Sequence, residues 1–472
     1  MSQSPNSELP TPNSQRIHFI AIGGAAMHNL AIALHNKGFR ISGSDDEINE
    51  PSLSRLKSLG LLPSEMGWFP EKITADLDAV ILGMHARADN PELLKAKELG
   101  IRIFSYPEYL YEFSKDKKRV VIGGSHGKTS ITAMVMHVLK SAGVDFDYMV
   151  GSKLEGFDTM VKLTKEAPVI ILEGDEYLAS PVDLRPKFHL YRADIALISG
   201  IAWDHINVFP TFEKYTEQFQ IFADLVPDNG VLIYCELDPE VKKVAAQSSS
   251  KCKKVPYGIP PHGIEKGITS LIVGETRIPL IIFGEHNLMN LEGARNICQL
   301  LGVTNQQFYS GISSFKGAAR RLELLGRNDT VSVFKDFAHS PSKLKATTEA
   351  VRRQFPDRKI IACMELHTFS SLNENFLEQY KGSMKEADMA IVYFNPHTIE
   401  HKKLKPITEE QVREAFGDKN IRVFINSEKL YDYFVEANHQ NTVVLMMSSG
   451  TFDGMNLDQL AQHIIQRSFT EA

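Results

Sequence analysis

The sequence is poor in cysteine and has no long apolar run, and each absence excludes a class of protein. Four cysteines occur in 472 residues, namely Cys235, Cys252, Cys298 and Cys363. Their spacing matches neither a zinc site nor a disulfide framework, so we expect reduced thiols and a cytoplasmic location. No apolar stretch reaches the ~18 residues that a membrane-spanning helix needs. The composition therefore predicts neither a disulfide-stabilised secreted fold nor a transmembrane one.

The sequence also lacks an excess of positive charge. Its 52 basic and 58 acidic residues give a net charge of −6. This balance argues against non-specific binding to nucleic acid or to an anionic membrane. The first fifteen residues, MSQSPNSELPTPNSQ, have no basic start and no apolar stretch, which predicts a disordered tail and no secretion signal. We expect no nucleic acid and no membrane among the partners, and a monomer or weak homodimer.

Short apolar runs alternate with amphipathic segments along most of the chain. The predicted strands are RIHFIAI, FRISGSD, DAVILGM and IRIF in the first part, VIILEG, IALISGI and GVLIY in the middle, and VSVFKDF, IIACME, MAIVYF, IRVFI and TVVLMM in the last. Such alternation of strands with helices predicts parallel, doubly wound sheets. We therefore predict an α/β fold, and the region 235–285, richer in Pro and Gly, is expected to hold only short strands.

The length exceeds what one hydrophobic core usually holds, so several domains are expected. The alternation predicts a Rossmann-like domain, a central phosphate-loop ATPase-type α/β domain and a Rossmann-like C-terminal domain. The predicted boundaries are 1–15 for the tail, then 16–116, 117–327 and 328–472. The charged segment SKDKKR, residues 114–119, is a plausible linker between the first two domains.

The stretch RVVIGGSHGKTS contains a glycine turn between a predicted strand and a predicted helix. Its loop is shorter than the usual G-x-x-x-x-G-K-[ST] motif. The physical elements remain: backbone N–H groups at a helix N-terminus, a lysine for phosphates and a hydroxyl for Mg²⁺. The alternative is an ordinary turn with a surface lysine, but the sequence context favours a phosphate site. The candidate residues are Gly124, Ser125, His126, Gly127, Lys128, Thr129 and Ser130.

A magnesium nucleotide also needs ligands from outside the loop. Glu173 lies where its predicted strand ends, with Asp175 and Glu176 just after it, and Asp204 and His205 follow the next strand. A histidine in such a place is more often a capping or packing residue. Acids and a histidine at the ends of successive strands, after a phosphate loop, favour a metal site.

A second glycine turn, IGGAAM, opens the chain at residues 22–27. It lacks the full G-x-G-x-x-G pattern, although Ser44 and Asp45 after the next strand could hold a ribose or sugar hydroxyl. Binding of NAD and a turn that serves only packing both stay open from these residues.

The motifs IGGAAM, GSHGKTS, EGDEY, WDH, GEHNLMN, FKGAARRLE and DFAHSP occur in an order that resembles the Mur ligase family. These are ATP-dependent, amide-bond-forming enzymes of peptidoglycan metabolism, and the resemblance covers about residues 16–470. It implies ATP and Mg²⁺ as cofactors and UDP-N-acetylmuramate as a substrate. The pyrophosphate of UDP would then lie at the first loop. The residues implied for the UDP-sugar are Gly23, Gly24, Ala25, Ala26, Met27, Ser44, Asp45 and His85.

The resemblance also implies roles in catalysis. Lys128 would hold the ATP phosphates, Thr129 and Glu173 one Mg²⁺, and His205 a second ion. His286, Asn287 and Asn290 would surround the adenine, Arg320 or Arg321 would reach the γ-phosphate, and Asp336 and His339 would close over the nucleotide and the reacting centre. The catalytic set is Lys128, Glu173, His205 and His339. No carbamoylated lysine is predicted, because glutamines stand at positions 218 and 220.

Two reactions of the family use UDP-N-acetylmuramate, and they differ in the acceptor amine. The segments EYLASPVDLRPKFHLY, RRLELLG and MSSGTFDG resemble the branch that adds a recycled murein tripeptide, L-Ala-γ-D-Glu-meso-diaminopimelate. The branch that adds L-alanine is expected to carry Arg-x-x-Arg where this sequence has Thr368 and Ser371. The tripeptide is therefore the predicted acceptor. L-alanine stays open as the alternative, because WDH and His339-Ser340 depart from the pattern of the peptide-adding branch.

Three groups of cations are candidates for binding the carboxylates of the tripeptide: Arg185, Lys187 and the run His401-Lys402-Lys403. A different class of protein also stays open, a nucleotide-dependent regulator that has lost turnover. The retained Lys128, Thr129, Glu173 and His205 favour an enzyme over such a regulator.

Overall fold

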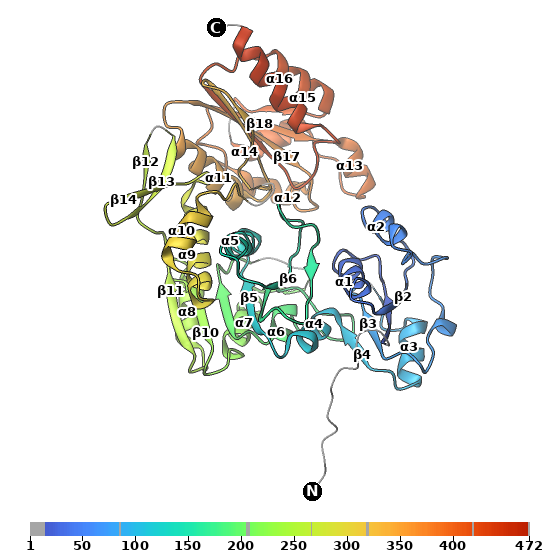
Figure 1. Cartoon of the computed structure of the whole chain (residues 1–472). Helices are drawn as coiled ribbons and strands as arrows, with labels where there is room; N and C mark the ends of the chain where they lie inside the picture. The colour runs from blue at the N-terminus through green and yellow to red at the C-terminus, as the bar shows by residue number, and fades with distance from the viewer. Residues whose placement is uncertain are drawn as a thin grey trace. The chain divides into compact units, whose positions relative to one another are not determined.

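The computed structural model describes residues 15–84, 86–203, 208–265, 267–317, 321–417 and 420–470. The chain forms two compact units (Figure 1). The first runs to Gly258 and includes Asn290–Phe308, and the second consists of Ile259–Met289 and the chain from Tyr309 onward. The predicted tail lies outside the described residues, except for Gln15.

The first unit begins with a four-stranded parallel sheet, built from β1 (Arg16–Ile20), β2 (Arg40–Ser44), β3 (Ala79–Leu82) and β4 (Ile103–Ser105). The strand order is β2-β1-β3-β4. The connecting helices are α1 (Ala25–His35), α2 (Ser52–Ser58), η2 (Pro70–Lys72), α3 (Pro91–Glu98) and α4 (Tyr106–Ser114). Ile20, Val80 and Leu93 belong to its buried core. The predicted strand–helix alternation is confirmed here.

A seven-stranded sheet follows in the same unit, in the order β11-β10-β9-β5-β8-β6-β7. Its strands are β5 (Lys118–Gly123), β6 (Asp147–Met149), β7 (Val161–Lys162), β8 (Val169–Glu173), β9 (Ile195–Ile198), β10 (Val231–Cys235) and β11 (Lys253–Tyr257). Only the β6–β7 pair is antiparallel. Since β8 and β9 pair with β5 on opposite sides, the loops after these three strands meet at one edge, which is where ligands of open sheets bind.

The helices around this sheet are α5 (Lys128–Ser141), α6 (Lys187–Leu190), α7 (Phe212–Asp224), α8 (Pro239–Gln247), α9 (Glu285–Leu300) and α10 (Asn305–Ile312). Helix α8 corrects the prediction of only short strands in 235–285. Asp238 caps this helix by accepting hydrogen bonds from the N–H groups of Glu240 and Val241. An Asp followed by Pro is a helix-start signal that the composition of the region obscured.

The charged segment 114–119 does join the first sheet to the second, since α4 ends at Ser114 and β5 begins at Lys118, but it is only partly solvated. Strand β5 begins at Lys118, and Lys117 is buried, with its ammonium 3.0 Å from the Asp147 carboxylate. The Arg119 guanidinium donates to the carbonyl oxygens of Ser114 and Lys117. Long cationic side chains can serve a fold interior when carbonyls and a carboxylate are within reach, so a charged run need not be solvated.

The second unit contains a six-stranded sheet in the order β15-β16-β20-β17-β18-β19. The strands are β15 (Glu323–Arg327), β16 (Val331–Asp336), β17 (Lys359–Leu366), β18 (Met389–Phe394), β19 (Arg422–Phe424) and β20 (Thr442–Met447), and only β15 is antiparallel to its neighbour. Its helices are α11 (Pro341–Gln354), α12 (Glu374–Leu377), η3 (Glu378–Tyr380), α13 (Pro396–His401), α14 (Glu409–Phe416), α15 (Ser427–Glu436) and α16 (Leu457–Thr470). The five strands predicted after residue 330 are confirmed.

Two separate apolar clusters form the core of this sheet. One includes Leu344 of α11 and Phe416 of α14, and the other includes Phe434 of α15 and Leu460 of α16. The unit also holds a small antiparallel sheet of β12 (His262–Glu265), β13 (Ile268–Val273) and β14 (Thr276–Pro279). Gln354 of α11 joins this sheet to the core by accepting from the Thr269 hydroxyl.

Three alternating α/β regions therefore confirm the predicted fold class, whereas the boundaries at 116/117 and 327/328 stay predictions. All four cysteines are buried free thiols. Within the described ranges, no helix is both long and apolar enough to cross a bilayer.

Candidate functional site

The loop between β5 and α5 is closely packed around two glycines with left-handed backbone. Gly124 has φ +131° and Gly127 has φ +81°. A Cβ atom on Gly124 would lie 2.2 Å from the Ser199 hydroxyl, and one on Gly127 would lie 2.4 Å from the side-chain oxygen of Asn290. Because neither position has room for a side chain, the loop backbone is held at the end of the sheet. The packing also brings Asn290, predicted near the adenine, to the phosphate loop.

Lys128 is the first residue of α5, and its ammonium group is held on two sides. It donates to the Gly124 carbonyl oxygen at 2.6 Å and to the Glu176 carboxylate at 2.7 Å. Burial alone would lower the pKa of Lys128, but the negative charge of Glu176 and its hydrogen bond raise it above the ordinary value. Lys128 therefore carries a positive charge beside the loop.

Glu176 is the residue whose role the sequence did not reveal. Its side chain is 1% exposed, and it also accepts from the Tyr215 hydroxyl of α7 at 3.0 Å. Tyr215 lies 2.9 Å from the hydroxyl of Ser125, so the loop, the lysine and α7 share one buried network. The acidic run after β8 marked Glu176 as a candidate, whereas nothing local in the sequence marked Tyr215.

Thr129 and Glu173 come together as predicted for a magnesium site. The Thr129 hydroxyl donates to a Glu173 carboxylate oxygen at 2.8 Å, and the Gly151 N–H donates to the other at 3.1 Å. The oxygen ligands that Mg²⁺ prefers are thus present beside the loop. Asp204 and His205 lie outside the described residues, and among those described no three His, Cys, Asp or Glu side chains form a metal cluster.

The other residues of the phosphate loop serve its structure or face solvent. The Ser125 N–H donates to the Gly200 carbonyl at 2.9 Å, and its hydroxyl accepts from the Ala202 N–H at 2.8 Å. His126 is exposed, and its carbonyl accepts from the Ser199 hydroxyl, while Ser130 is buried in the first turn of α5. The loop is therefore tied to the segment after β9 at several points.

Two cations predicted to bind the acceptor peptide lie in the segment after β8, and each forms an ion pair with a carboxylate. The Lys187 ammonium is 2.6 Å from the Asp175 carboxylate, which holds the pKa of Asp175 below its usual value in spite of burial. The Arg185 guanidinium lies 2.6 Å from Asp183 and 3.4 Å from Glu108. Both side chains already have carboxylate partners of their own.

In the second unit, the half-buried His286 and the buried Asp336 interact electrostatically. Burial raises the pKa of Asp336, against the backbone N–H groups of Leu322 and Ala338, each 2.7 Å from the carboxylate. Burial lowers the pKa of His286, against the charge of Asp336. Both were predicted near the nucleotide, and the structure brings them together within one unit.

The remaining predicted nucleotide residues of this unit are held by local contacts. Asn287 donates to the Phe283 carbonyl at 2.9 Å, and the Arg321 guanidinium lies 4.6 Å from the centre of the Phe337 ring. The imidazole Nδ1 of His339 lies 2.8 Å from the Phe337 carbonyl, and the His339 carbonyl accepts from the Tyr380 hydroxyl. Arg320 lies outside the described residues, so the choice between Arg320 and Arg321 stays open.

The first glycine loop is closed by a carboxylate. The Gly23 N–H donates to Asp45 at 2.7 Å, and a Cβ atom on Gly23 would lie 2.8 Å from Ile48. Burial raises the pKa of Asp45, against the hydrogen bond from Gly23. Ser44 and Asp45 are both buried, so they support the loop from inside the fold. Their predicted contact with a sugar hydroxyl stays a prediction, and His85 lies outside the described residues.

Gly24 caps α1, so its first residues, Ala25, Ala26 and Met27, present free backbone N–H groups. Arg55 of α2 lies close by and was not singled out from the sequence. Its guanidinium donates to the Asn29 side chain at 2.9 Å and to Nε2 of His28 at 3.2 Å. Burial, together with the charge of Arg55, lowers the pKa of His28, so the imidazole stays neutral and accepts from Arg55. No carboxylate pairs with Arg55 among the described residues.

The positions expected to carry an arginine pair for L-alanine hold two hydroxyls that satisfy each other. The Thr368 hydroxyl donates to Ser371 Oγ at 2.9 Å and accepts from the Ser371 N–H at 3.0 Å. Ser371 is fully buried. Beside them, Glu365 is a buried carboxylate that accepts from Ser448 and from the Phe452 N–H, and the His367 imidazole lies 3.6 Å from it.

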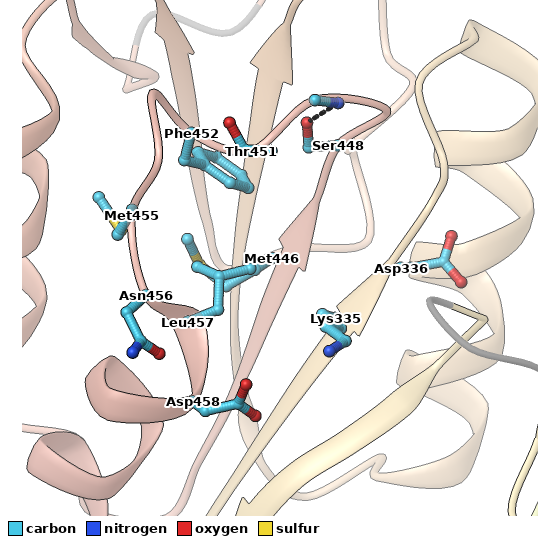
Figure 2. Close-up of a pocket in the computed structure, with 11 residues that line it drawn as sticks. Lys335, Asp336, Met446, Ser448, Thr451, Phe452, Met455, Asn456, Leu457 and Asp458 are labelled. Carbon is cyan, nitrogen blue, oxygen red and sulfur yellow. Dashed lines mark hydrogen bonds between the residues drawn. The ribbon is translucent and has the colours of Figure 1, made fainter. Parts of the chain in front are cut away.

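A cavity of about 200 Å³ lies at the end of β20, near the start of α16 (Figure 2). Its lining combines the apolar side chains of Met446, Phe452, Met455 and Leu457 with polar and charged groups that include Lys335 and Asp458. Lys335 is paired with Glu323 at 3.0 Å. The Asp336 carboxylate is directed away from the apolar cluster in Figure 2, and none of His286, Asn287 and Asn290, which were predicted around the adenine, lines this cavity.

Three family models match this chain, and each covers one of its three α/β regions. Residues 16–118 match a model described as the Mur ligase family catalytic domain, residues 122–298 match the Mur ligase middle domain, and residues 320–450 match the Mur ligase glutamate ligase domain. A UDP-N-acetylmuramate–L-alanine ligase from Sulfurihydrogenibium sp. (strain YO3AOP1) is 31% identical over 462 residues, with 96% of this chain and 98% of the relative covered.

Solved structures share the fold at lower identity. A murein peptide ligase from Psychrobacter arcticus has a TM-score of 0.61 at 21% identity, with 97% of this chain and 98% of that chain covered. A UDP-N-acetylmuramate–alanine ligase from Thermotoga maritima has a TM-score of 0.67 at 20% identity, with 97% of this chain and 100% of that chain covered. Proteins of both names therefore share the fold.

Proposed function

Because the chain belongs to the Mur ligase family of ATP-dependent, ADP-forming amide ligases, we propose that it joins UDP-N-acetylmuramate to a murein peptide. The family uses UDP-N-acetylmuramate substrates with an amino acid or peptide partner. In this proposal the acceptor is L-Ala-γ-D-Glu-meso-diaminopimelate, and the bond forms between its terminal amine and the lactyl carboxylate of the sugar.

The observation that carries the choice of acceptor is the hydroxyl pair of Thr368 and Ser371. A single amino acid brings its carboxylate close to the reacting amine, where a desolvated arginine pair would hold it. Ser371 is fully buried and its hydroxyl is hydrogen-bonded to Thr368, so these two positions supply no cation for that carboxylate. A peptide carries its carboxylates further from the reacting amine, and such a clamp is then unnecessary.

L-alanine remains the second candidate, because a specific observation favours it. The relative from Sulfurihydrogenibium bears the name of an L-alanine ligase, and so do other relatives at 26–32% identity. The murein peptide ligases of known structure are 21% and 23% identical to this chain, so sequence similarity favours L-alanine, whereas the residues at positions 368 and 371 favour the peptide.

The phosphate loop supports ATP as the energy source. The N–H groups at the start of α5 and the charged ammonium of Lys128 suit the β- and γ-phosphates. We propose that nucleotide phosphate replaces Glu176 as the main partner of Lys128, and that Gly124, Ser125, His126, Gly127 and Ser130 shape the cradle. Asn290, His286, Asn287, Asp336 and Arg320 or Arg321 are proposed to contact the remainder of the nucleotide.

Thr129 and Glu173 fit a magnesium ion, since a hydroxyl and a carboxylate oxygen lie 2.8 Å apart beside the loop. They would hold the ion together with nucleotide phosphate, and His205 is proposed as a ligand of a second ion. Bound there, Mg²⁺ would neutralise charge that develops on the phosphoryl oxygens. His339 is proposed to lie at the reacting centre.

The proposed reaction has two steps. The lactyl carboxylate attacks the γ-phosphorus of ATP, which gives an acyl phosphate and releases ADP. The acceptor amine, once deprotonated, attacks the acyl carbon, and the tetrahedral intermediate collapses to the amide as phosphate leaves. The protein supplies orientation and positive charge, which are the main sources of catalysis in phosphoryl transfer.

The first loop is the proposed UDP site, formed by Gly23, Gly24, Ala25, Ala26, Met27, Ser44, Asp45 and His85. We propose in addition that Arg55 contacts the diphosphate. The loop carries backbone N–H groups and no cation of its own, and the guanidinium of Arg55 is held nearby by two uncharged side chains, those of His28 and Asn29. The three domains are proposed to meet at 116/117 and 327/328.

The experiment that tests the proposal measures phosphate release from ATP with UDP-N-acetylmuramate and either the tripeptide or L-alanine. We expect release only when both a sugar and an amine are present, with kcat/KM about a hundredfold higher for the tripeptide. Equal or better use of L-alanine would give the second candidate the advantage. Phosphate release at the same rate in the absence of both acceptors would indicate a nucleotide hydrolase without ligase activity.

A further inference from the structure

The carboxylates of the proposed acceptor need cations, and the structure separates the three cationic candidates. Arg185 and Lys187 are each paired with nearby carboxylates at 2.6 Å. Binding a peptide carboxylate at either place would first require an existing ion pair to break. Neither residue is therefore a favourable anchor for an incoming carboxylate.

The run His401-Lys402-Lys403, at the end of α13, differs in this respect. Among the described residues no carboxylate forms an ion pair with Lys402 or Lys403, whereas the nearby Lys405 is paired with Glu374 at 2.5 Å. Lys402 is half-buried because its ammonium lies over the Phe369 ring, 4.4 Å from the ring centre. A cation on an aromatic face keeps its charge available and has fewer orientations to lose when it binds an anion.

Phe369 is itself unusual, because 60% of this large apolar side chain is exposed. It follows Thr368 directly in the loop after β17, and α13 follows the neighbouring strand β18. These strands run parallel and pair along their length, so both loops lie at the same edge of the sheet. The loop that carries His339 follows β16 at this same edge. Phe369 and Lys402 therefore lie on the side of the unit where the proposed acceptor residues gather.

We propose that Lys402, seated on Phe369, and the adjacent Lys403 bind the distal carboxylates of the acceptor peptide. The proposal rests on the proposed function and adds the residues that select the peptide. The ring offers apolar surface to the aliphatic part of the peptide, and the two ammonium groups receive carboxylates that L-alanine does not have at that distance from its amine. The neutral pair Thr368–Ser371 then disfavours L-alanine, and the charged pair Lys402–Lys403 favours the tripeptide.

The test compares acceptors rather than overall activity. Initial rates of phosphate release are measured for the wild type, Lys402→Ala, Lys402→Arg and Phe369→Ala, with the tripeptide, with L-Ala-γ-D-Glu and with L-alanine. We expect Lys402→Ala to raise the KM for the tripeptide about twofold to fivefold, the range of a partly exposed ion pair, with kcat and the KM of ATP unchanged. Lys402→Arg retains the charge and should stay close to wild type. Lys429→Ala, an exposed lysine on α15, is the matched control.

The acceptor series keeps this proposal distinct from the proposed function. The effect of Lys402→Ala should shrink with the dipeptide and vanish with L-alanine, and the double variant Lys402→Ala/Lys403→Ala should give a larger effect than either alone. If the wild type prefers the tripeptide but its KM does not change in these variants, the anchor assignment is wrong and the function stands. If the wild type prefers L-alanine, both are wrong. Thermal unfolding of each variant identifies any loss of fold.

Discussion

The two glycine loops of the first unit have the same local design and different chemistry. Each joins the end of a parallel strand to a helix, from β1 to α1 and from β5 to α5. In the first loop a carboxylate, Asp45, accepts from the loop's own Gly23 N–H. In the second, Glu176 and Glu173 accept from Lys128 and Thr129, and the loop is braced by glycine packing. The same fold therefore gives one loop without a cation, proposed to bind a diphosphate, and one with a lysine and a hydroxyl–carboxylate pair, proposed to bind phosphate and a metal ion.

The difference fits the two substrates. A nucleotide sugar has to be held through its diphosphate without reaction there, and backbone N–H groups with a cation from a separate helix suffice. A phosphate that is transferred needs charge neutralisation that grows in the transition state, which requires a lysine and metal ligands fixed at the loop. We therefore expect changes at the second loop to act on kcat and changes at the first to act on the KM for the sugar.

The largest effect is expected for Lys128→Ala. This change removes the only cation of the second loop, and kcat should fall about a thousandfold, the loss typical of removing a strong transition-state donor. Lys140→Ala, an exposed lysine near the end of the same helix, is the control. Phosphate release measures the rate, and a circular dichroism melt checks the fold. Near-normal kcat in Lys128→Ala would mean that the two loops do not differ in the way described.

The second effect concerns the free energy of unfolding and His189, a buried residue of α6. His189 is buried, donates to the Gln218 carbonyl and stacks on Phe188, and burial lowers its pKa from 6.5 to about 4. The unfolded chain binds the proton more readily, so stability is complete above pH 6.5 and is lost as the pH falls toward 4. The difference of about 2.5 pH units corresponds to about 3 kcal/mol.

Melting temperature as a function of pH measures this effect. The wild type should lose stability between pH 6.5 and 4 more steeply than His189→Gln, which has no proton to gain. His397→Gln is the control, because that side chain is 91% exposed. Equal slopes for the wild type and His189→Gln would show that this histidine is not the group that titrates.

Next in size is Glu173→Gln. The amide keeps the shape of the side chain and removes the charge that a metal ion requires, so we expect about a hundredfold lower kcat at ordinary Mg²⁺ concentration, with partial recovery as Mg²⁺ is raised. Glu166→Gln, exposed in the segment before β8, is the control. A variant whose activity and Mg²⁺ requirement match the wild type would remove Glu173 from the metal site.

The smallest effect is expected at the first loop. Arg55→Ala should raise the KM for UDP-N-acetylmuramate about tenfold through loss of one charged phosphate contact, with kcat nearly unchanged. Arg55→Lys should recover part of this loss. The exposed Lys57 of the same helix, changed to Ala, is the control. An effect on kcat with no change in KM would show that the first loop acts on the chemical step.

The parts of the fold that follow from local pattern were predictable from the sequence. Most strands of the three larger sheets have apolar runs, and Lys128, Thr129 and Glu173 lie at or after strand ends that the alternation located. What the sequence did not reveal depends on contacts between distant segments. Tyr215 reaches Glu176 from a helix 39 residues away, and nothing in its own helix distinguishes it from a core tyrosine.

Charge pattern was the least reliable guide. The run 114–119 resembles a solvated linker by composition, yet carbonyl groups and Asp147 hold Lys117 and Arg119 inside the fold. Arg55 resembles an ordinary surface residue of a short helix, and only the neutral partners around it indicate that its charge is available. For cations, the identity of the partner matters more than the local sequence, and partners are set by tertiary structure.

The buried ammonium of Lys117 has a consequence for dividing the chain. Asp147 is fully buried, and its carboxylate accepts from the N–H and the hydroxyl of Thr164 as well as pairing with Lys117. A fragment that starts at Lys118 would leave this carboxylate without its cation, which costs about 3–5 kcal/mol when a buried pair loses one partner. A fragment that starts two or three residues earlier keeps the pair. The choice of the first residue thus decides whether a separately expressed fragment is stable enough to be purified.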